Sequence, residues 1–426
     1  MFESLFEIDA EASEADLRAS VEHFERLKSA AAAAQARATA LWATKRDQAE
    51  AAAGVRADKH GRGLGAEVAL ARHEAPVCGA KFLGLAKALV HEMPHTLAAL
   101  DNGMLSEWRA ALIVRESACL TVEDRRRLDA RLCQDPTRLQ SWGNARIEAE
   151  TKKIAVELDA AAVIDRATKT AQQRCVTIRP APDAMTYLTA FLPLKQGVAV
   201  YAALNQAANT TVDERTRAQI MADTVYERIT GRPADKPVPV DLGLVMADTT
   251  LVGDDQAPVW LKNYGPIPAS LARELATDAA LDDDVKATIR RLYRHPDTSQ
   301  LVAMESRARI FPKGLARFIT TRDHTCRTPF CNAPIRHSDH AQPHREGGTT
   351  SAHNGLGMCE ACNYAKEAPG WTVTTNDTDG NHTAEFTTPT GAVYHSTAPP
   401  LPGPSTRRIS LVEGELSIDL VTFDAA

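Results

Sequence analysis

The sequence predicts an α+β protein with a mostly helical N-terminal domain and a small C-terminal module of short strands. An alanine-rich stretch with helical periodicity runs from residue 13 to 53, and an alternating pattern typical of strands begins near residue 174. After residue 367 the chain turns to Gly, Thr, Pro and Asn. With 426 residues, 44% hydrophobic and 24% charged, we expect a soluble protein of two or three domains.

The stretch from 13 to 53 is predicted to be one long helix, with Ser13 as its start cap. Apolar residues recur every three or four positions and predict one packing face: Leu17, Val21, Phe24, Leu27, Ala31, Ala34, Ala38 and Leu41. The face could pair within the chain or between two chains, so a homo-oligomer through the N-terminal helices is one possibility.

Further helices are predicted over Glu67–Met93 and after the start residues Ser106 and Thr121. A hairpin follows from residue 175 to 193. The next predicted elements are helices at 196–209 and 214–231, a strand at 238–253, a helix at 270–277 and strands within 289–305. Near the C-terminus short strands are predicted at 371–375, 384–388 and 392–394.

These patterns predict five regions. They are an N-terminal long-helix region (1–65), a helical or α+β domain (66–305), a cysteine-containing module (306–370), a short β-rich extension (371–404) and a mobile tail (405–426). The acidic opening MFESLFEIDAEASEADL resembles no signal peptide, and no apolar run is long enough to cross a membrane. We therefore expect a cytoplasmic protein without a membrane partner.

Four cysteines occur in two close pairs, Cys326/Cys331 and Cys359/Cys362. Cytoplasmic thiols stay reduced, so paired cysteines there more often bind metal than form disulfides. Four thiolates at this spacing can hold one zinc with no open coordination position, which predicts a structural ion.

Polar residues between and after the cysteine pairs suggest hydrolytic chemistry. A short strand near 336–342 carries Asp339, a hard oxygen ligand for Mg²⁺ or Mn²⁺, and His340, which can take a proton from water. A turn-rich loop leads to a second strand near Asn354, which can tie that loop in place. A helix beginning near residue 359 carries Asn363, whose amide oxygen can bind a cation, and Lys366, which can approach a phosphate.

The ordered set D-H-x2-P-x3-G-G-x5-N-x4-C-x2-C-N-x2-K resembles the HNH (ββα-metal) endonuclease motif, in the variant whose third letter is Asn. The resemblance covers residues 322–367. It implies that His340 is the general base, that Asp339 and Asn363 bind one divalent ion, and that Asn354 orients the hairpin and the base. It also implies that the four cysteines form zinc knuckles, and that the products carry 5′-phosphate and 3′-hydroxyl ends.

A second resemblance lies upstream. The segments LPLKQGVAVYAALNQAA, RTRAQIMADTVYERITG and GPIPASLAREL resemble the actinobacterial "domain of unknown function 222", or REP-repeat family, from about Leu83 to Leu301. This resemblance implies a mostly helical domain and no particular substrate.

The predicted function is hydrolysis of DNA phosphodiester bonds, with His340, Asn354 and Lys366 in catalytic roles. Arg336, Arg345 and Lys366 are predicted to contact nucleic acid; residues 305–367 carry a net charge of +3 within a chain of net charge −6. The alternative is a zinc-dependent nucleic-acid-binding protein without cleavage. An interaction protein working through its N-terminal helices and a hydrolase acting on RNA are further alternatives.

Overall fold

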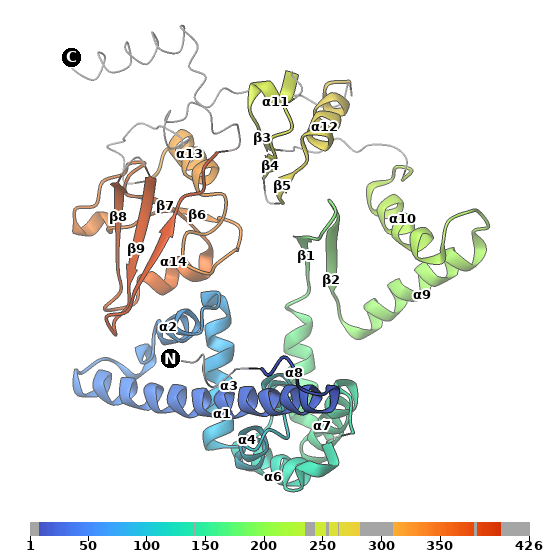
Figure 1. Cartoon of the computed structure of the whole chain (residues 1–426), viewed down its shortest axis with the longest axis vertical. Coiled ribbons are helices and arrows are strands. Elements are labelled where there is room, and N and C mark those ends of the chain that lie inside the picture. The colour runs from blue at the N-terminus through green and yellow to red at the C-terminus, as the bar shows by residue number, and fades with distance from the viewer. Residues whose placement is uncertain are drawn as a thin grey trace. The chain divides into compact units, whose positions relative to one another are not determined.

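The computed structural model describes residues 8–139, 141–234, 243–252, 255–262, 264–281, 310–378 and 381–401. It has helices along the N-terminal part of the chain and small sheets in the C-terminal part (Figure 1). Two compact units are present, Met1–Gln173 with Tyr364–Pro369 and Arg174–Asn363 with Gly370–Ala426. The five predicted regions stay predictions. Within the described part of the chain, no helix has the length and apolar character that crossing a membrane requires.

Helices and short 3-10 turns make up residues 14–171. They are α1 (Glu14–Ala52), η2 (Ala57–Lys59), α2 (Leu64–Ala71), η3 (Pro76–Cys78), α3 (Gly79–His91), α4 (Pro94–Asp101), α5 (Glu107–Ser117), α6 (Val122–Cys133), η4 (Pro136–Leu139), α7 (Asn144–Leu158) and α8 (Ala160–Ala171). The predicted starts of α1, α5 and α6 are confirmed. The side chains of Ser13, Ser106 and Thr121 each accept a hydrogen bond from a first-turn backbone N–H, which satisfies a group that has no partner within the helix.

The predicted packing face of α1 is wrong. The structure buries Ser29, Ala32, Ala33, Ala36, Thr39, Ala40 and Ala43. The predicted residues Ala31, Ala34 and Ala38 are exposed, and Leu41 is 57% exposed. Alanine recurs on both faces of this helix, so periodicity could not choose between them. Ala32, Ala33 and Ala36 pack against α3, α4 and α5, with Leu85, Leu89 and Leu100 in the same cluster.

The helices predicted over Glu67–Met93 are two, because α2 ends at Ala71 and α3 begins at Gly79. His73 has a positive φ of 57°, and Pro76, which cannot donate a backbone hydrogen bond, opens η3 between the two helices. The helices pass very close together. A Cβ on Gly79 would lie 1.8 Å from the Gly65 carbonyl oxygen, so this crossing requires glycine.

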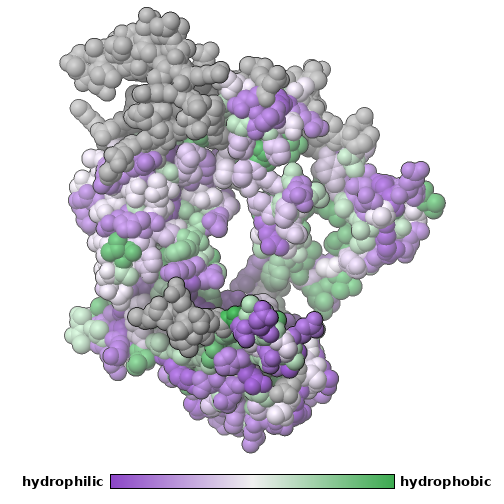
Figure 2. Space-filling model, viewed as in Figure 1, coloured by the Kyte–Doolittle hydropathy of each residue, from purple (hydrophilic) through white to green (hydrophobic). Residues whose placement is uncertain are grey.

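The hairpin predicted near residue 174 is confirmed. Strands β1 (Cys175–Pro180) and β2 (Thr186–Phe191) pair antiparallel, and helices α9 (Leu194–Thr210) and α10 (Arg217–Thr230) follow. Every residue of both strands is exposed. Exposed large apolar side chains include Val176, Ile178, Met185, Tyr187, Leu188, Phe191, Leu194, Val198, Val200 and Tyr201. Figure 2 shows hydrophobic surface, in green, over this region.

A small three-stranded sheet follows. Its order is β3 (Leu244–Val245), β4 (Val259–Leu261), β5 (Gly265–Ile267), with α11 (Asp248–Val252) and α12 (Ala269–Leu281) as its helices. The predicted strand 238–253 is wrong at 248–252, which is helical. The Thr249 and Thr250 hydroxyls donate to the Asp255 carboxylate, each at 3.1 Å, and such local bonds compete with strand pairing. The predicted strands at 289–305 and the tail at 405–426 lie outside the described residues.

The C-terminal module spans residues 310–401. Its elements are α13 (Lys313–Asp323), β6 (His337–His340), η5 (His344–Glu346), β7 (Gly355–Met358), α14 (Glu360–Lys366), β8 (Thr372–Thr378), β9 (Asn381–Thr387) and β10 (Val393–Thr397). The predicted strands here are confirmed. β6 and β7 pair antiparallel, with His337 opposite Met358 and His340 opposite Gly355, and β10-β9-β8 form a second sheet.

One apolar core unites this module. Leu356 and Met358 of β7 cluster with the four cysteines and with Val373, Ala384 and Phe386 of the second sheet. The residues predicted as a β-rich extension therefore share the core of the cysteine module. Helix α13 packs closely against β7 at Gly355, which has no side chain. A Cβ at this position would lie 2.5 Å from the Ile319 Cδ1 atom.

Candidate metal centre and hydrolytic site

The four cysteines of the module converge on one point. Their sulfur atoms all lie within 4.8 Å of one another, and each cysteine is at most 6% exposed. The Cys331 and Cys359 sulfurs are 3.9 Å apart. A tetrahedron with sulfur about 2.3 Å from its centre has edges of about 3.8 Å, so the cluster has the dimensions of a four-thiolate zinc site. The four cysteines predicted as zinc ligands therefore lie close enough together to hold the ion.

The crowded thiols shift one another's acidity. Hydrogen bonds from Cys326 and Cys362 lower the pKa of Cys331 to about 4, whereas hydrogen bonding with Cys326 and Cys331 raises the pKa of Cys362. The sulfurs therefore compete for the same protons. Zinc binds the thiolate form of cysteine, so an ion held by these four sulfurs would replace the protons that they share.

A buried ion network beside the cysteines was not predicted from the sequence. Asp323, 1% exposed, accepts from the Arg322 guanidinium at 2.7 Å, from Arg327 at 2.9 Å and from the Gly357 backbone N–H at 2.7 Å. Burial acts to raise the pKa of this carboxyl, but the two arginines hold it below its ordinary value. A pair of arginines beside an aspartate is too common in sequences to mark such a site.

The same network reaches the second sheet. Arg327 contacts the His382 Nδ1 atom at 3.2 Å and donates to the Ser396 carbonyl oxygen at 2.5 Å. His382 in turn contacts the His353 carbonyl oxygen at 2.7 Å, and burial lowers the pKa of His382 to about 4. These bonds fix the hairpin, the first cysteine loop and strands β9 and β10 to one another.

Asp339 and His340 lie side by side at the end of β6. Several of the described residues contact the His340 ring. Phe311 packs at 4.6 Å and His344 at 5.7 Å between ring centroids, and the Thr350 hydroxyl lies 2.9 Å from His340 Nε2. The Nδ1 atom is 3.9 Å from the Asp339 carboxylate, which is longer than a hydrogen bond. His340 is only 7% exposed, whereas the Asp339 side chain is 29% exposed.

Asn354 ties the loop between the two strands, as its residue type predicted. Its Oδ1 accepts from the Gln342 backbone N–H at 2.9 Å. Its Nδ2 donates to the Gln342 carbonyl oxygen at 3.0 Å and to the Thr349 carbonyl oxygen at 2.9 Å. All three bonds join the two ends of one loop, so the Asn354 side chain sets the loop's width.

Asn363 lies in the first turns of α14, where its backbone N–H donates to the Cys359 carbonyl oxygen at 3.0 Å. Its side-chain Oδ1 is buried and has no hydrogen-bond partner among the residues that the structure describes. A buried amide oxygen without a donor is costly, and a cation would satisfy it. Lys366, further along α14, pairs with Glu367 at 2.7 Å, which offsets its charge.

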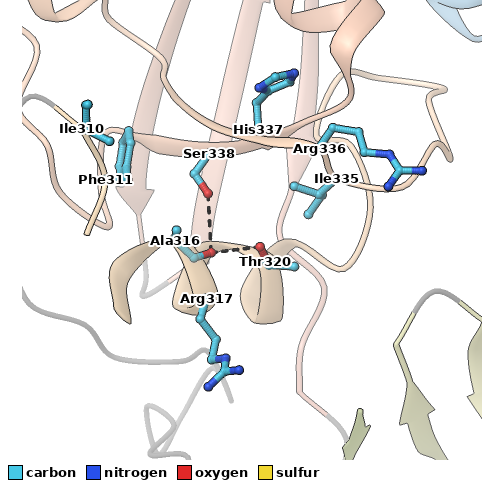
Figure 3. Close-up of a pocket in the computed structure, with 9 residues that line it drawn as sticks. All are labelled: Ile310, Phe311, Ala316, Arg317, Thr320, Ile335, Arg336, His337 and Ser338. Atoms are coloured by element: carbon cyan, nitrogen blue, oxygen red, sulfur yellow. Dashed lines mark hydrogen bonds between the residues drawn. The ribbon is translucent and has the colours of Figure 1, made fainter. Parts of the chain in front are cut away.

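A pocket of about 390 Å³ lies between α13 and β6 (Figure 3). Its lining residues are Ile310, Phe311, Ala316, Arg317, Thr320, Ile335, Arg336, His337 and Ser338. The Ser338 hydroxyl points toward the Ala316 carbonyl oxygen, at 3.5 Å, while His337 extends to the opposite side of the strand (Figure 3). The lining carries two arginines and no carboxylate. Of the other predicted nucleic-acid contacts, Arg345 is exposed and pairs with Glu346 at 3.3 Å.

The fold and site together define a chain with a large helical part and a C-terminal module that can bind zinc. Comparison with protein families shows that the chain belongs to the family described as "Domain of unknown function (DUF222)", which matches residues 21–323. The predicted family is thus confirmed over a wider range than Leu83 to Leu301. The match ends before Cys326, so the HNH resemblance stays a prediction. No curated protein and no solved structure matches the chain.

Proposed function

We propose that the C-terminal module is a metal-dependent DNA endonuclease of the HNH type. The observation that carries the proposal is the buried Asn363 amide oxygen, which accepts no hydrogen bond from the described part of the chain. It lies on the helix directly after a hairpin that carries Asp339 and His340 on one strand and is closed by Asn354. Zinc binding alone gives no reason for an unsatisfied amide at this position.

The Asp339 carboxylate and the Asn363 amide oxygen fit a hard divalent cation such as Mg²⁺ or Mn²⁺. When bound, such an ion would neutralise the negative charge that develops on the phosphate and on the leaving oxygen. Among the described residues, the cysteines are the one group of three or more His, Cys, Asp or Glu side chains near enough to share an ion. The second cation site therefore depends on the amide of Asn363.

His340 acts as the general base in this proposal. Its Nε2 lies 2.9 Å from the Thr350 hydroxyl, and we assign Nδ1, on the Asp339 side, as the nitrogen that takes the proton from the attacking water. The water oxygen forms a bond to phosphorus as the bond from phosphorus to the 3′-oxygen breaks. Phe311 and His344 keep the imidazole in place against that strand.

The DNA backbone would lie along the basic rim beside β6. Arg317 and Arg336, which line the pocket, can each neutralise a phosphate. Arg345 adds a third exposed guanidinium on the loop. Lys366 is the weakest of the predicted contacts, because Glu367 already neutralises it.

A plasmid-nicking assay with Mg²⁺ or Mn²⁺ tests the function. We expect His340→Ala to lower the cleavage rate by about 10²–10⁴-fold while one zinc per chain is retained. His395→Ala, an exposed histidine of the same module, is the matched control and should cleave at the wild-type rate. Wild-type protein that binds plasmid without nicking it would instead support the binding module. Full cleavage by His340→Ala would show that the assigned base is wrong.

A further inference from the structure

Thr350 links the loop that Asn354 closes to the ring of His340. The Thr350 hydroxyl and His340 Nε2 are 2.9 Å apart, and the two residues are 3% and 7% exposed. In such a buried place a hydrogen bond to a ring nitrogen strongly affects where the imidazole carries its proton. The motif that resembles known endonucleases leaves this position as an unspecified residue.

The position of Thr350 is fixed by the residues on either side of it. Asn354 donates to the Thr349 carbonyl oxygen at 2.9 Å, and its backbone N–H donates to the Ser351 hydroxyl at 3.0 Å. Gly348 passes so close to the start of the loop that a Cβ there would lie 1.8 Å from the Gln342 carbonyl oxygen. The loop therefore has little freedom to move its threonine away from the ring.

A neutral imidazole has one N–H donor and one acceptor nitrogen. If Nε2 carries the hydrogen and donates it to the Thr350 oxygen, the acceptor lone pair is on Nδ1, beside Asp339. We propose that Thr350 is a positioning residue that selects this tautomer and so directs the basic nitrogen of His340 toward the attacking water. The effect of Thr350 on catalysis rests on the proposed function. The tautomer of His340 can be measured in the protein without DNA.

The contact between Thr350 and His340 also explains how Asn354 can affect the His340 ring without bonding to it directly. Asn354 sets the width of the loop, the loop presents Thr350, and Thr350 holds Nε2. An Asn354 substitution should therefore disturb the same tautomer through Thr350.

Nitrogen NMR of the full chain with ¹⁵N-labelled histidine, at a pH where His340 is neutral, tests the tautomer directly. The His340 signals are assigned by their loss in His340→Gln. We expect the wild type to show a protonated Nε2 and an unprotonated Nδ1. Thr350→Val should move the two ¹⁵N shifts toward each other, as a mixture of tautomers forms, and Thr350→Ser should restore the wild-type shifts. A wild-type signal with the hydrogen on Nδ1 overturns the proposal whether or not the variants fold.

Plasmid nicking gives the second readout. We expect Thr350→Val to lower kcat by about 10–100-fold with KM unchanged, as is typical of partners that orient a reacting group, and Thr350→Ser to recover most of it. If Thr350→Val leaves kcat unchanged, Thr350 does not have the proposed role. The same conclusion follows if this variant leaves the His340 tautomer unchanged. If the wild type does not nick DNA, the proposed function fails while the NMR result still decides the tautomer.

Discussion

Residues 310–401 and residues 175–230 resemble each other in secondary structure, since each combines short antiparallel strands with helices. They differ in what their side chains contact. In 310–401 the strands bury Leu356, Met358 and Phe386 around four cysteines, and Asp323 is fully paired. In 175–230 Ile220 is the one buried residue among the described elements.

The difference shows that regular secondary structure and a closed core are separate properties. A two-stranded hairpin is marginal in water unless a further layer covers it. The C-terminal module has that layer in its second sheet, and it also has a buried ion network and a cysteine cluster that can hold zinc. No described residue buries the strands of the β1–β2 hairpin, so its contribution to the stability of the folded chain should be small.

The largest expected effect is loss of the metal. We expect Cys359→Ser/Cys362→Ser, or prolonged chelation, to unfold residues 310–401 while the helices of 14–171 stay folded. Structural zinc contributes on the order of 10 kcal/mol to small domains of this kind. Zinc content by mass spectrometry and hydrogen exchange of each region measure the result, with the half-buried Cys119→Ser as control. Retention of slow exchange in β7 without zinc would contradict the structural role.

A smaller effect is expected from acid. Burial holds the pKa of His382 at about 4, against about 6.5 in an unfolded chain. As the pH falls below about 6.5 the unfolded state gains a proton that the folded state does not, so stability is lost progressively until about pH 4. The full loss is about 3 kcal/mol. Thermal melting of the module between pH 7.5 and 4.5 should show this slope, and His382→Gln should flatten it. An equal slope in His382→Gln would assign the acid sensitivity to other groups.

The smallest effects should come from the exposed hairpin region. We expect Leu188→Ser and Val198→Ser to change the free energy of unfolding by at most about 0.5 kcal/mol, because neither side chain is buried. For comparison, Leu356→Ala at a fully buried position should lower the free energy of unfolding by about 2–5 kcal/mol. Urea denaturation measures both. A loss above about 2 kcal/mol for Leu188→Ser would mean that this surface is covered in solution.

Features encoded by local chemistry were predictable from the sequence. Ser13, Ser106 and Thr121 cap helices because their hydroxyls satisfy first-turn N–H groups, and the two cysteine pairs meet in the cluster that their spacing predicts for a metal site. Asn354 also closes its loop as expected. In each case a few neighbouring residues decide the outcome.

Features decided by distant contacts were not predictable. The buried face of α1 depends on which neighbours its alanines meet, and both faces have the same periodicity. Asp323 and Arg327 become a buried network only when β9 and β10 are packed against them. Thr350 carries no signal in the sequence, since its importance comes from the ring that lies beside it after folding.

The separation of the two cysteine pairs along the chain has a consequence for biosynthesis. Cys331 and Cys359 stand 28 residues apart, with both strands of the β6–β7 hairpin between them. During translation Cys326 and Cys331 leave the ribosome before Cys359 and Cys362. The set of four zinc ligands is therefore incomplete until the second pair has been made. We therefore expect the β6–β7 hairpin of a newly made chain to close only after Cys359 and Cys362 have joined the first pair around an ion.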